Sequence, residues 1–227
     1  MGRRQDSQGL GKAFKHARIM APPPDKLLKF YRRVATHGWS ASKHYTYTHA
    51  NPCLRNWLAR RLRHSSTVLS VGCGSGELEI DLRKQNHRVV GMDISAEMLR
   101  TASCRGLSSI VQADAHFLPF RSSCFSVVIF PESLGYLKLE EAIRETTRVL
   151  TNRGRLVITT YPFNSIVHSL YAQSTLAELR RHLAEAGLRI RTLRFLRTTY
   201  KQVKLVRSER RSTLLYILAA KEPSWNC

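Results

Sequence analysis

The chain has 227 residues, of which 43% are hydrophobic, and this length and composition suit one folded domain with a single core. No apolar run approaches the roughly 20 residues of a membrane-spanning helix. The five cysteines form no C-x-x-C pair, and we interpret His44, His49 and Cys53 as loop and helix-start residues. We therefore expect an intracellular, cytoplasmic protein with no metal site and no transmembrane segment.

The formal net charge is +21, and it is unevenly distributed. Residues 1–66 carry 14 basic and 2 acidic side chains, residues 67–150 carry 9 and 10, and residues 151–227 carry 14 and 4. The centre is nearly neutral and both flanks are strongly basic. This asymmetry predicts a negatively charged partner, either RNA or an anionic membrane surface, with an arginine-rich solvated surface as the plain alternative.

The N-terminal part reads as a tail followed by two helices. Residues 1–24 are basic and end in Pro22-Pro23-Pro24, so we expect a disordered tail. A helix is predicted over residues 25–35. A second begins at Asn51-Pro52, because Asn accepts hydrogen bonds from unpaired helix amides and Pro suits the first helical position, and it runs to about Arg63.

From residue 67 onward, short apolar runs alternate with amphipathic helical segments. Strands are predicted over residues 67–71, 87–92, 109–112, 125–130 and 155–161, and helices over 76–85, 95–104, 139–150 and 174–186. Two further strands, 188–197 and 213–220, have no helix between them and can pair as an antiparallel hairpin at one edge. The alternation predicts an α/β fold with a largely parallel sheet, whose core is residues 67–161 and which residues 162–227 complete.

A glycine-rich turn follows the first predicted strand. Gly72 permits a tight turn, Gly74 lets a ligand approach the backbone, and Gly76 lets the next helix start close to the strand. The unpaired N–H groups at such a helix start favour a polar or anionic ligand. A glycine turn alone is equally consistent with a purely structural role.

Two acidic residues follow the next two predicted strands. Asp93 ends the second strand about 20 residues after Gly72, where an acid is placed to accept both ribose hydroxyls of a nucleotide-like ligand. It can also cap the helix that starts at Ser95. Asp114 follows the third strand, where it can accept from an adenine amine or lie in a solvated loop. The two acids together favour a site for an adenosine-containing ligand.

Five motifs follow one another in a set order and spacing within residues 67–160. They are VLSVGCGSG at 68–76, VGMDIS at 90–95, LPF at 118–120, RVL at 148–150 and GRLVI at 154–158. This set resembles the core of the class I methyltransferases that use S-adenosylmethionine (SAM), in the broad family that includes quinone-pathway C-methyltransferases. The resemblance implies a Rossmann-like, seven-stranded, mostly parallel sheet with its last strand antiparallel and helices on both faces. It also implies SAM as the cofactor and, over residues 25–66, an N-terminal helical lid.

The resemblance assigns roles along the glycine loop and after the next two strands. The first two loop glycines would face the methionine part of SAM, Asp93 the ribose and Asp114 the adenine. The expected cofactor-binding residues are Ser70, Gly72, Cys73, Gly74, Gly76, Asp93, Ile94, Asp114 and Ala115. Two positions depart from the family pattern: Ser70 stands where an acid is usual, and Ser126 where an aspartate usually steadies the loop. These departures keep open a SAM-binding adaptor without catalysis.

The acceptor is expected at residues 131–136, after the fourth predicted strand. Glu132 is a candidate base or a helix-start acid facing water, and Tyr136 lines the acceptor pocket or simply packs. The segment lacks the Asn/Asp-Pro-Pro-aromatic motif of enzymes that methylate base amines, so we predict transfer to a small-molecule or lipid-like acceptor. The alternative is RNA-directed transfer through the basic flanks. The C-terminal flank carries Arg189, Arg191, Arg194, Arg197, Lys201, Lys204, Arg207, Arg210 and Arg211.

Overall fold

The computed structural model describes residues 48, 51–62, 66–161, 174–199, 202–208, 212 and 214–222. The tail expected over residues 1–24 and the helix expected over 25–35 lie outside the described residues. The next predicted helix is present as α2, Pro52–Ala59, and the Asn51 side chain caps it by accepting from the backbone N–H of Leu54. It ends at Ala59, short of the predicted end at Arg63.

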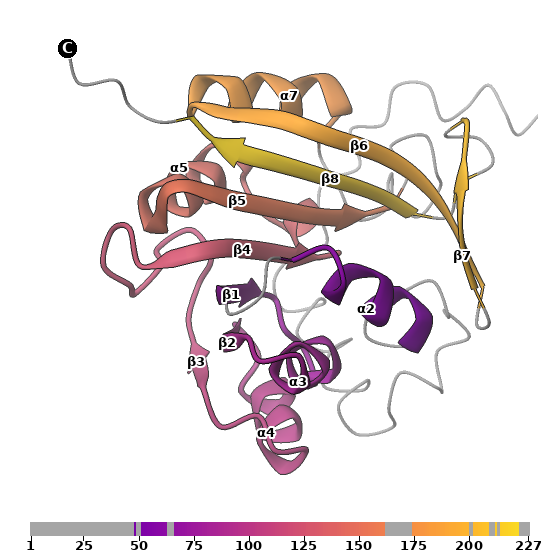
Figure 1. The fold of residues 1–227 in the computed structure, drawn as a ribbon. Helices are drawn as coiled ribbons and strands as arrows, with labels where there is room; N and C mark the ends of the chain where they lie inside the picture. The colour runs from indigo at the N-terminus through magenta and orange to yellow at the C-terminus, as the bar shows by residue number, and fades with distance from the viewer. Residues whose placement is uncertain are drawn as a thin grey trace, which may run out of the picture.

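One eight-stranded sheet organises the chain, in the order β3-β2-β1-β4-β5-β8-β6-β7 (Figure 1). Its strands are β1 Thr67–Val71, β2 Arg88–Asp93, β3 Ile110–Gln112, β4 Phe125–Pro131, β5 Leu150–Thr160, β6 Leu188–Thr199, β7 Gln202–Val206 and β8 Leu214–Lys221. The first five are parallel, and β8 runs antiparallel to both β5 and β6. The predicted α/β fold with an antiparallel last strand is therefore confirmed.

Helices cover both faces of the sheet, so most of its strands are buried on both sides. They are α2, α3 Glu77–Lys84, α4 Ala96–Cys104, α5 Leu139–Val149 and α7 Leu176–Glu185. Leucines of α2 and α3 pack with Val68, Val127 and Val157 on one face. Residues of α5 and α7 pack on the other face, against Val128 and Ile158. Because side chains alternate along β4 and β5, each of these strands contributes residues to two hydrophobic cores, one on each face of the sheet.

The C-terminal strands differ from the prediction in two ways. An eighth strand, β7, follows β6 as an edge hairpin, and β8 is inserted between β5 and β6 instead of forming the edge. β7 is difficult to predict because it is a five-residue edge strand in which no residue is fully buried, so no buried apolar run marks it. The strand predicted over residues 155–161 begins earlier, as β5 starts at Leu150; within its added residues Arg153 has φ 65° and the pairing with β4 shifts register.

Candidate functional site

The glycine turn lies at the carboxyl end of β1, between that strand and α3. Gly72, Gly74 and Gly76 have φ of 78°, 53° and 81°, a left-handed region that favours glycine. The backbone N–H groups of Gly72 and Cys73 both donate to the carbonyl of Met92, at 2.7 and 3.0 Å. The turn is therefore fastened to β2, and its start is closed by hydrogen bonds within the protein.

Ser133, just after β4, packs against the glycine turn at Gly72. Its hydroxyl donates to the carbonyl of Val71. A Cβ added at Gly72 would lie 2.4 Å from the Ser133 Cβ and 2.9 Å from its Oγ, so only glycine fits beneath it. Ser133 was not among the residues expected at the site, because nothing in the sequence shows that the end of β4 rests on this glycine.

Asp93 joins the glycine turn to the start of α4. Its Oδ2 accepts from the N–H of Gly74 at 2.8 Å, and its Oδ1 accepts from the N–H of Ser95 at 2.9 Å. Ser95 is the helix cap, since its own hydroxyl accepts from Met98 N–H. A carboxylate offers about four acceptor positions, so Asp93 can hold both amides and still accept ribose hydroxyls. The capping and ribose-binding interpretations are thus compatible.

Apolar and acidic groups face solvent beside Asp93. Ile94 is 50% exposed, although large aliphatic side chains are normally buried. Asp114 follows β3, and its Oδ1 accepts from the N–H and from the ring Nδ1 of His116, at 2.9 and 2.6 Å. The His116 Nε2 accepts from Lys138 N–H at 3.0 Å, which assigns the ring proton to Nδ1. Asp114 is therefore oriented by His116, and its second oxygen takes part in neither hydrogen bond.

Three predicted residues lie beneath this surface. Ser70 is fully buried, and its hydroxyl has no hydrogen-bond partner among the described residues. The Cys73 thiol is also buried, and burial followed by the charge of Glu79 raises its pKa well above the usual range. Its side chain contributes packing against Gly91, whose added Cβ would lie 2.9 Å from the sulfur. Ala115 is 8% exposed, just after Asp114.

Ser126 does not lie near the glycine turn. It is at the start of β4, where its hydroxyl accepts from the Thr67 N–H at 3.0 Å and donates to the Thr67 carbonyl at 3.1 Å. The turn is at the other end of β1. The expectation that a residue at this position steadies the turn is thus wrong for this chain, since Ser126 fastens the amino ends of β1 and β4.

Glu132 lies directly after β4 in the left-handed region, with φ 55°, and it is 8% exposed. Its two carboxylate oxygens accept from Thr48, one from the N–H at 2.8 Å and the other from the hydroxyl at 2.6 Å. The alternative of an acid facing water is therefore wrong. Glu132 instead holds the segment that leads into α2, a contact between residues 84 positions apart that the sequence does not reveal.

Tyr136 ends a short 3-10 helix, η2, which spans Leu134–Tyr136. It is half-buried, in the same turn that carries Ser133 over the glycine loop. The carboxyl ends of β1, β2, β3 and β4 thus bring one set of predicted residues to a single edge of the sheet, as parallel strands require. Glu132 and Tyr136 lie on the β4 side of that set, and Asp93 and Asp114 on the β2 and β3 side.

Known proteins match the part of the chain that carries this site. Residues 69–158 match the family described as a methyltransferase domain. The chain carries a class I SAM-dependent methyltransferase domain. The cofactor of such domains is SAM, as the motifs had indicated.

Individual relatives match the same region. An uncharacterised protein of Methanocaldococcus jannaschii is 33% identical over 136 residues, which cover 60% of this chain and 49% of that one. A malonyl-[acyl-carrier protein] O-methyltransferase of Herminiimonas arsenicoxydans is 34% identical over 120 residues, 52% of this chain and 45% of that one. The chain spans about half the length of these curated relatives. Among solved structures, a [4+2]-cyclase superposes with a TM-score of 0.70 at 18% identity, covering 90% of this chain and 98% of that one.

The residues of the methyltransferase domain fit SAM at three points. The glycine turn, with three left-handed glycines, leaves no Cβ between the loop backbone and a ligand. The buried Ser70 hydroxyl has an unused hydrogen-bonding capacity at the end of β1. Ile94 offers an exposed apolar surface beside the Asp93 carboxylate, as a flat adenine next to a ribose requires.

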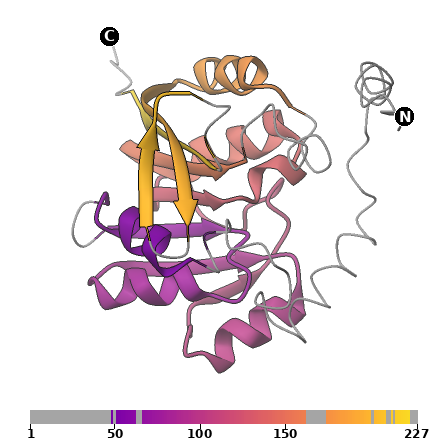
Figure 2. The same cartoon turned by 90° about the vertical axis from the view of Figure 1, so that its right-hand side faces the viewer.

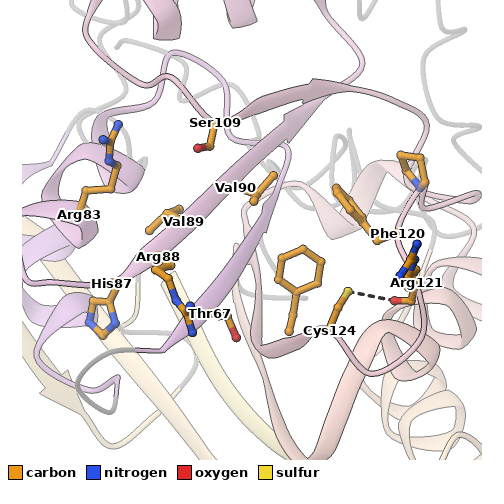
Figure 3. Close-up of a pocket in the computed structure, with 12 residues that line it drawn as sticks. Thr67, Arg83, His87, Arg88, Val89, Val90, Ser109, Phe120, Arg121 and Cys124 are labelled. Atoms are coloured by element: carbon orange, nitrogen blue, oxygen red, sulfur yellow. Dashed lines mark hydrogen bonds between the residues drawn. The ribbon is translucent and has the colours of Figure 1, made fainter.

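A separate hollow lies at the opposite end of the strands. It has a volume of about 760 Å³, and Thr67, Arg88 and Phe125 line it at the amino ends of β1, β2 and β4 (Figure 3). Arg83 and Arg121 also border it. Since cofactors of such α/β sheets bind at the carboxyl ends of the strands, this hollow is not the SAM site.

No helix in the described part of the chain combines the length and apolar character needed to cross a membrane. Within the same residues, no group of three or more His, Cys, Asp and Glu side chains is arranged to hold a metal ion.

Proposed function

We propose that this chain transfers the methyl group of SAM to an oxygen atom of a small-molecule or lipid-like acceptor. The observation that carries the proposal is the gathering of the glycine turn, Asp93, Asp114 and the β4 segment at one edge of the sheet. Two relatives support the acceptor class. Their names describe O-methyltransferases, one acting on malonyl-[acyl-carrier protein] and one in ubiquinone biosynthesis.

The cofactor roles follow the geometry of the edge. Asp93 would accept the ribose hydroxyls, and Asp114, oriented by His116, would accept the adenine amine. Ile94 and the backbone at Ala115 would border the adenine ring. Ser70, Cys73 and the three loop glycines would shape the backbone cradle for the methionine part, with Cys73 acting through its backbone because its thiol is buried.

The acceptor side rests on the turn after β4. When bound, SAM supplies an electrophilic methyl carbon, so the protein mainly positions the acceptor oxygen in line with it and excludes water. Glu132 is engaged with Thr48 through both oxygens, and we assign it a positioning role for the segment before α2. Tyr136 is half-buried in η2 and is proposed to line the acceptor pocket. A carboxylate acceptor needs no base, whereas a hydroxyl acceptor must lose its proton.

RNA-directed methyl transfer remains the second candidate. It is favoured by the 14 basic and 4 acidic side chains of residues 151–227. It is opposed by the segment Pro131-Glu132-Ser133, which offers no motif for a base amine. A third candidate, a SAM-binding adaptor without catalysis, rests on Ser70 in place of the usual acid.

One labelling experiment separates the three candidates. The purified chain is incubated with methyl-labelled SAM and an extract that is then fractionated into RNA, lipids and small molecules. The proposal predicts label in the small-molecule or lipid fraction, in a form released by mild alkali if the product is a carboxyl ester. Label in RNA alone would replace the proposal with the second candidate. SAM binding without label in any fraction would favour the adaptor.

A further inference from the structure

A second hollow lies on the α2 side of the sheet, and it shares no residue with the SAM site. It has a volume of about 380 Å³ and opens between α2, β8 and the β6–β7 hairpin, with Trp57, Arg61, Arg194, Leu205 and Tyr216 in its wall. Figure 2 shows the hairpin reaching down beside α2, and the Asn51 side chain ties the two by donating to the carbonyl of Thr199 at 3.1 Å. The hollow therefore has a fixed shape set by three elements.

Two aromatic rings that meet edge-on, and a cation stacked on one of them, form one wall. The Trp57 ring meets Tyr216 edge-on, with centroids 5.0 Å apart and planes at 87°. The Arg61 guanidinium carbon lies 3.4 Å from the Trp57 ring centroid, and its Nη1 also donates to the Trp57 carbonyl at 2.8 Å. Arg61 is exposed, so the stack presents a planar, positively charged face to solvent. Such faces stack well with nucleic-acid bases.

Sheet register adds two further arginines to this face. Arg194 on β6 pairs directly with Tyr216 on β8. Arg155 on β5 lies two positions from Val157, on the side of the sheet that Val157 shares with Tyr216 in one core. Burial raises the pKa of the Tyr216 phenol, and the charges of Arg61 and Arg155 act on it in the opposite direction, as their proximity requires.

These cations are not neutralised by neighbouring acids. Among the described residues, Arg61, Arg155 and Arg194 form no ion pair, whereas Arg189 and Arg191 on the same strand share Glu222. The hollow has no acidic residue in its wall. Three uncompensated arginines beside two aromatic rings suit a ligand that carries repeated negative charges and flat faces.

We propose that this hollow, between α2 and β6–β8, docks single-stranded nucleic acid through Arg61 and Arg194 in its wall and through Arg155 beside it on the same face of the sheet. A bilayer surface fits it less well, because a flat membrane cannot enter a concave wall and Leu205, 58% exposed, is its only strongly exposed large apolar side chain among the described residues. Docking is independent of which acceptor is methylated. The proposal assigns part of the basic C-terminal flank to a defined binding surface, whereas its net charge alone would give only non-specific attraction.

Helix α2 also connects the hollow to the edge of the sheet where methyl transfer is proposed. Trp57 and Arg61 belong to or follow this helix, whose eight residues span about 12 Å. At its other end, Thr48 hydrogen-bonds to Glu132 at the carboxyl end of β4. A strand docked along α2 would therefore lie roughly one helix length from the acceptor segment.

The test measures binding of fluorescein-labelled 12-nucleotide oligo(U) to the full chain by anisotropy over a range of salt concentrations. Arg155→Gln with Arg194→Gln removes two of the proposed contacts. Arg88→Gln with Arg121→Gln removes the same charge at the hollow of the opposite edge, where both side chains are exposed, and serves as the matched control. Thermal stabilisation by SAM is recorded for every variant, so a folding defect or loss of the SAM site is recognised separately.

Each lost phosphate contact on a single strand should reduce the slope of log K against log salt by about 0.7. The proposal predicts a slope lower by about 1.4 for the Arg155/Arg194 variant, with affinity at least about tenfold weaker at low salt, and little change for the control. Equal losses in the two variants would mean diffuse attraction and would overturn the proposal. Selective loss of binding to phosphatidylserine vesicles, with oligo(U) binding intact, would also overturn it and assign the surface to membranes.

Discussion

Replacing Gly72 by alanine tests whether the glycine turn is built as described. Two costs arise at this position. The left-handed φ of 78° costs an alanine about 1–2 kcal/mol. In addition, the new Cβ would lie 2.4 Å from the Ser133 Cβ. A Cβ is bonded directly to the backbone, so a rotation of the Ser133 side chain cannot relieve this overlap.

The second cost separates Gly72 from an ordinary turn glycine. Relieving the overlap must displace Ser133, which breaks its hydrogen bond to Val71 and costs about 1 kcal/mol, and it strains the turn after β4 by about 1–3 kcal/mol. Gly187 is the matched control, because its φ is 71° and nothing lies within 4 Å of an added Cβ. Gly72→Ala should therefore destabilise the chain by about 3 kcal/mol more than Gly187→Ala.

Thermal unfolding and SAM titration of the two variants provide the assay. For a chain of this size, about 3 kcal/mol corresponds to a Tm roughly 6–12 °C lower. Adding Ser133→Gly to Gly72→Ala removes the clashing Cβ and should recover part of the loss, as a double-mutant cycle detects. Equal Tm values for Gly72→Ala and Gly187→Ala, or no recovery on adding Ser133→Gly, would refute the proposed packing of the turn.

Three further predictions concern single side chains. Glu132→Gln should lower the unfolding free energy by about 1–3 kcal/mol, because the amide cannot accept hydrogen bonds from both the N–H and the hydroxyl of Thr48. Lowered methyl transfer with unchanged stability would instead indicate that Glu132 acts as a base. In the native chain iodoacetamide should modify the exposed Cys104 and spare Cys73, whose burial keeps its pKa high, as peptide mapping will show; rapid native labelling of Cys73 would contradict its placement. The hydrogen bond from Arg148 lowers the pKa of Glu145 from its ordinary value, so its stabilisation is present above the unfolded pKa and is lost as pH falls through the folded one. Glu145→Gln should thus lower Tm more at neutral pH than in acid, and an equal loss in both would argue against this linkage.

The sequence predicted the centre of the fold well, because buried parallel strands leave a simple signal. Val127 to Phe130 is a continuous apolar run, and it forms most of β4 as expected. The glycine turn was equally readable, since three left-handed residues in a short loop require glycine. The β7 edge strand was not, because it is only five residues long and none of residues 202–206 is fully buried.

Contacts between residues far apart along the chain could not be predicted from the sequence, for a different reason. Glu132 was expected either to act as a base or to face water, and its partner proved to be Thr48, far away along the chain. Ser126 was placed near the glycine turn by family pattern alone, whereas strand register puts it at the amino end of β4 beside Thr67. Residue type and spacing identify what a side chain can do, but only the register of the sheet decides what it meets.

Binding of SAM by the chain and by an Asp93→Asn variant, measured by isothermal titration calorimetry, tests the account most directly. Asp81→Asn is the control, because it makes the same chemical change at an aspartate that pairs with Arg55 outside the site. We predict saturable SAM binding to the wild type, little change for Asp81→Asn, and affinity at least about tenfold lower for Asp93→Asn, since a carboxylate hydrogen bond contributes about 1.5–3 kcal/mol. No binding to the wild type, or equal affinities for the wild type and Asp93→Asn, would contradict the account.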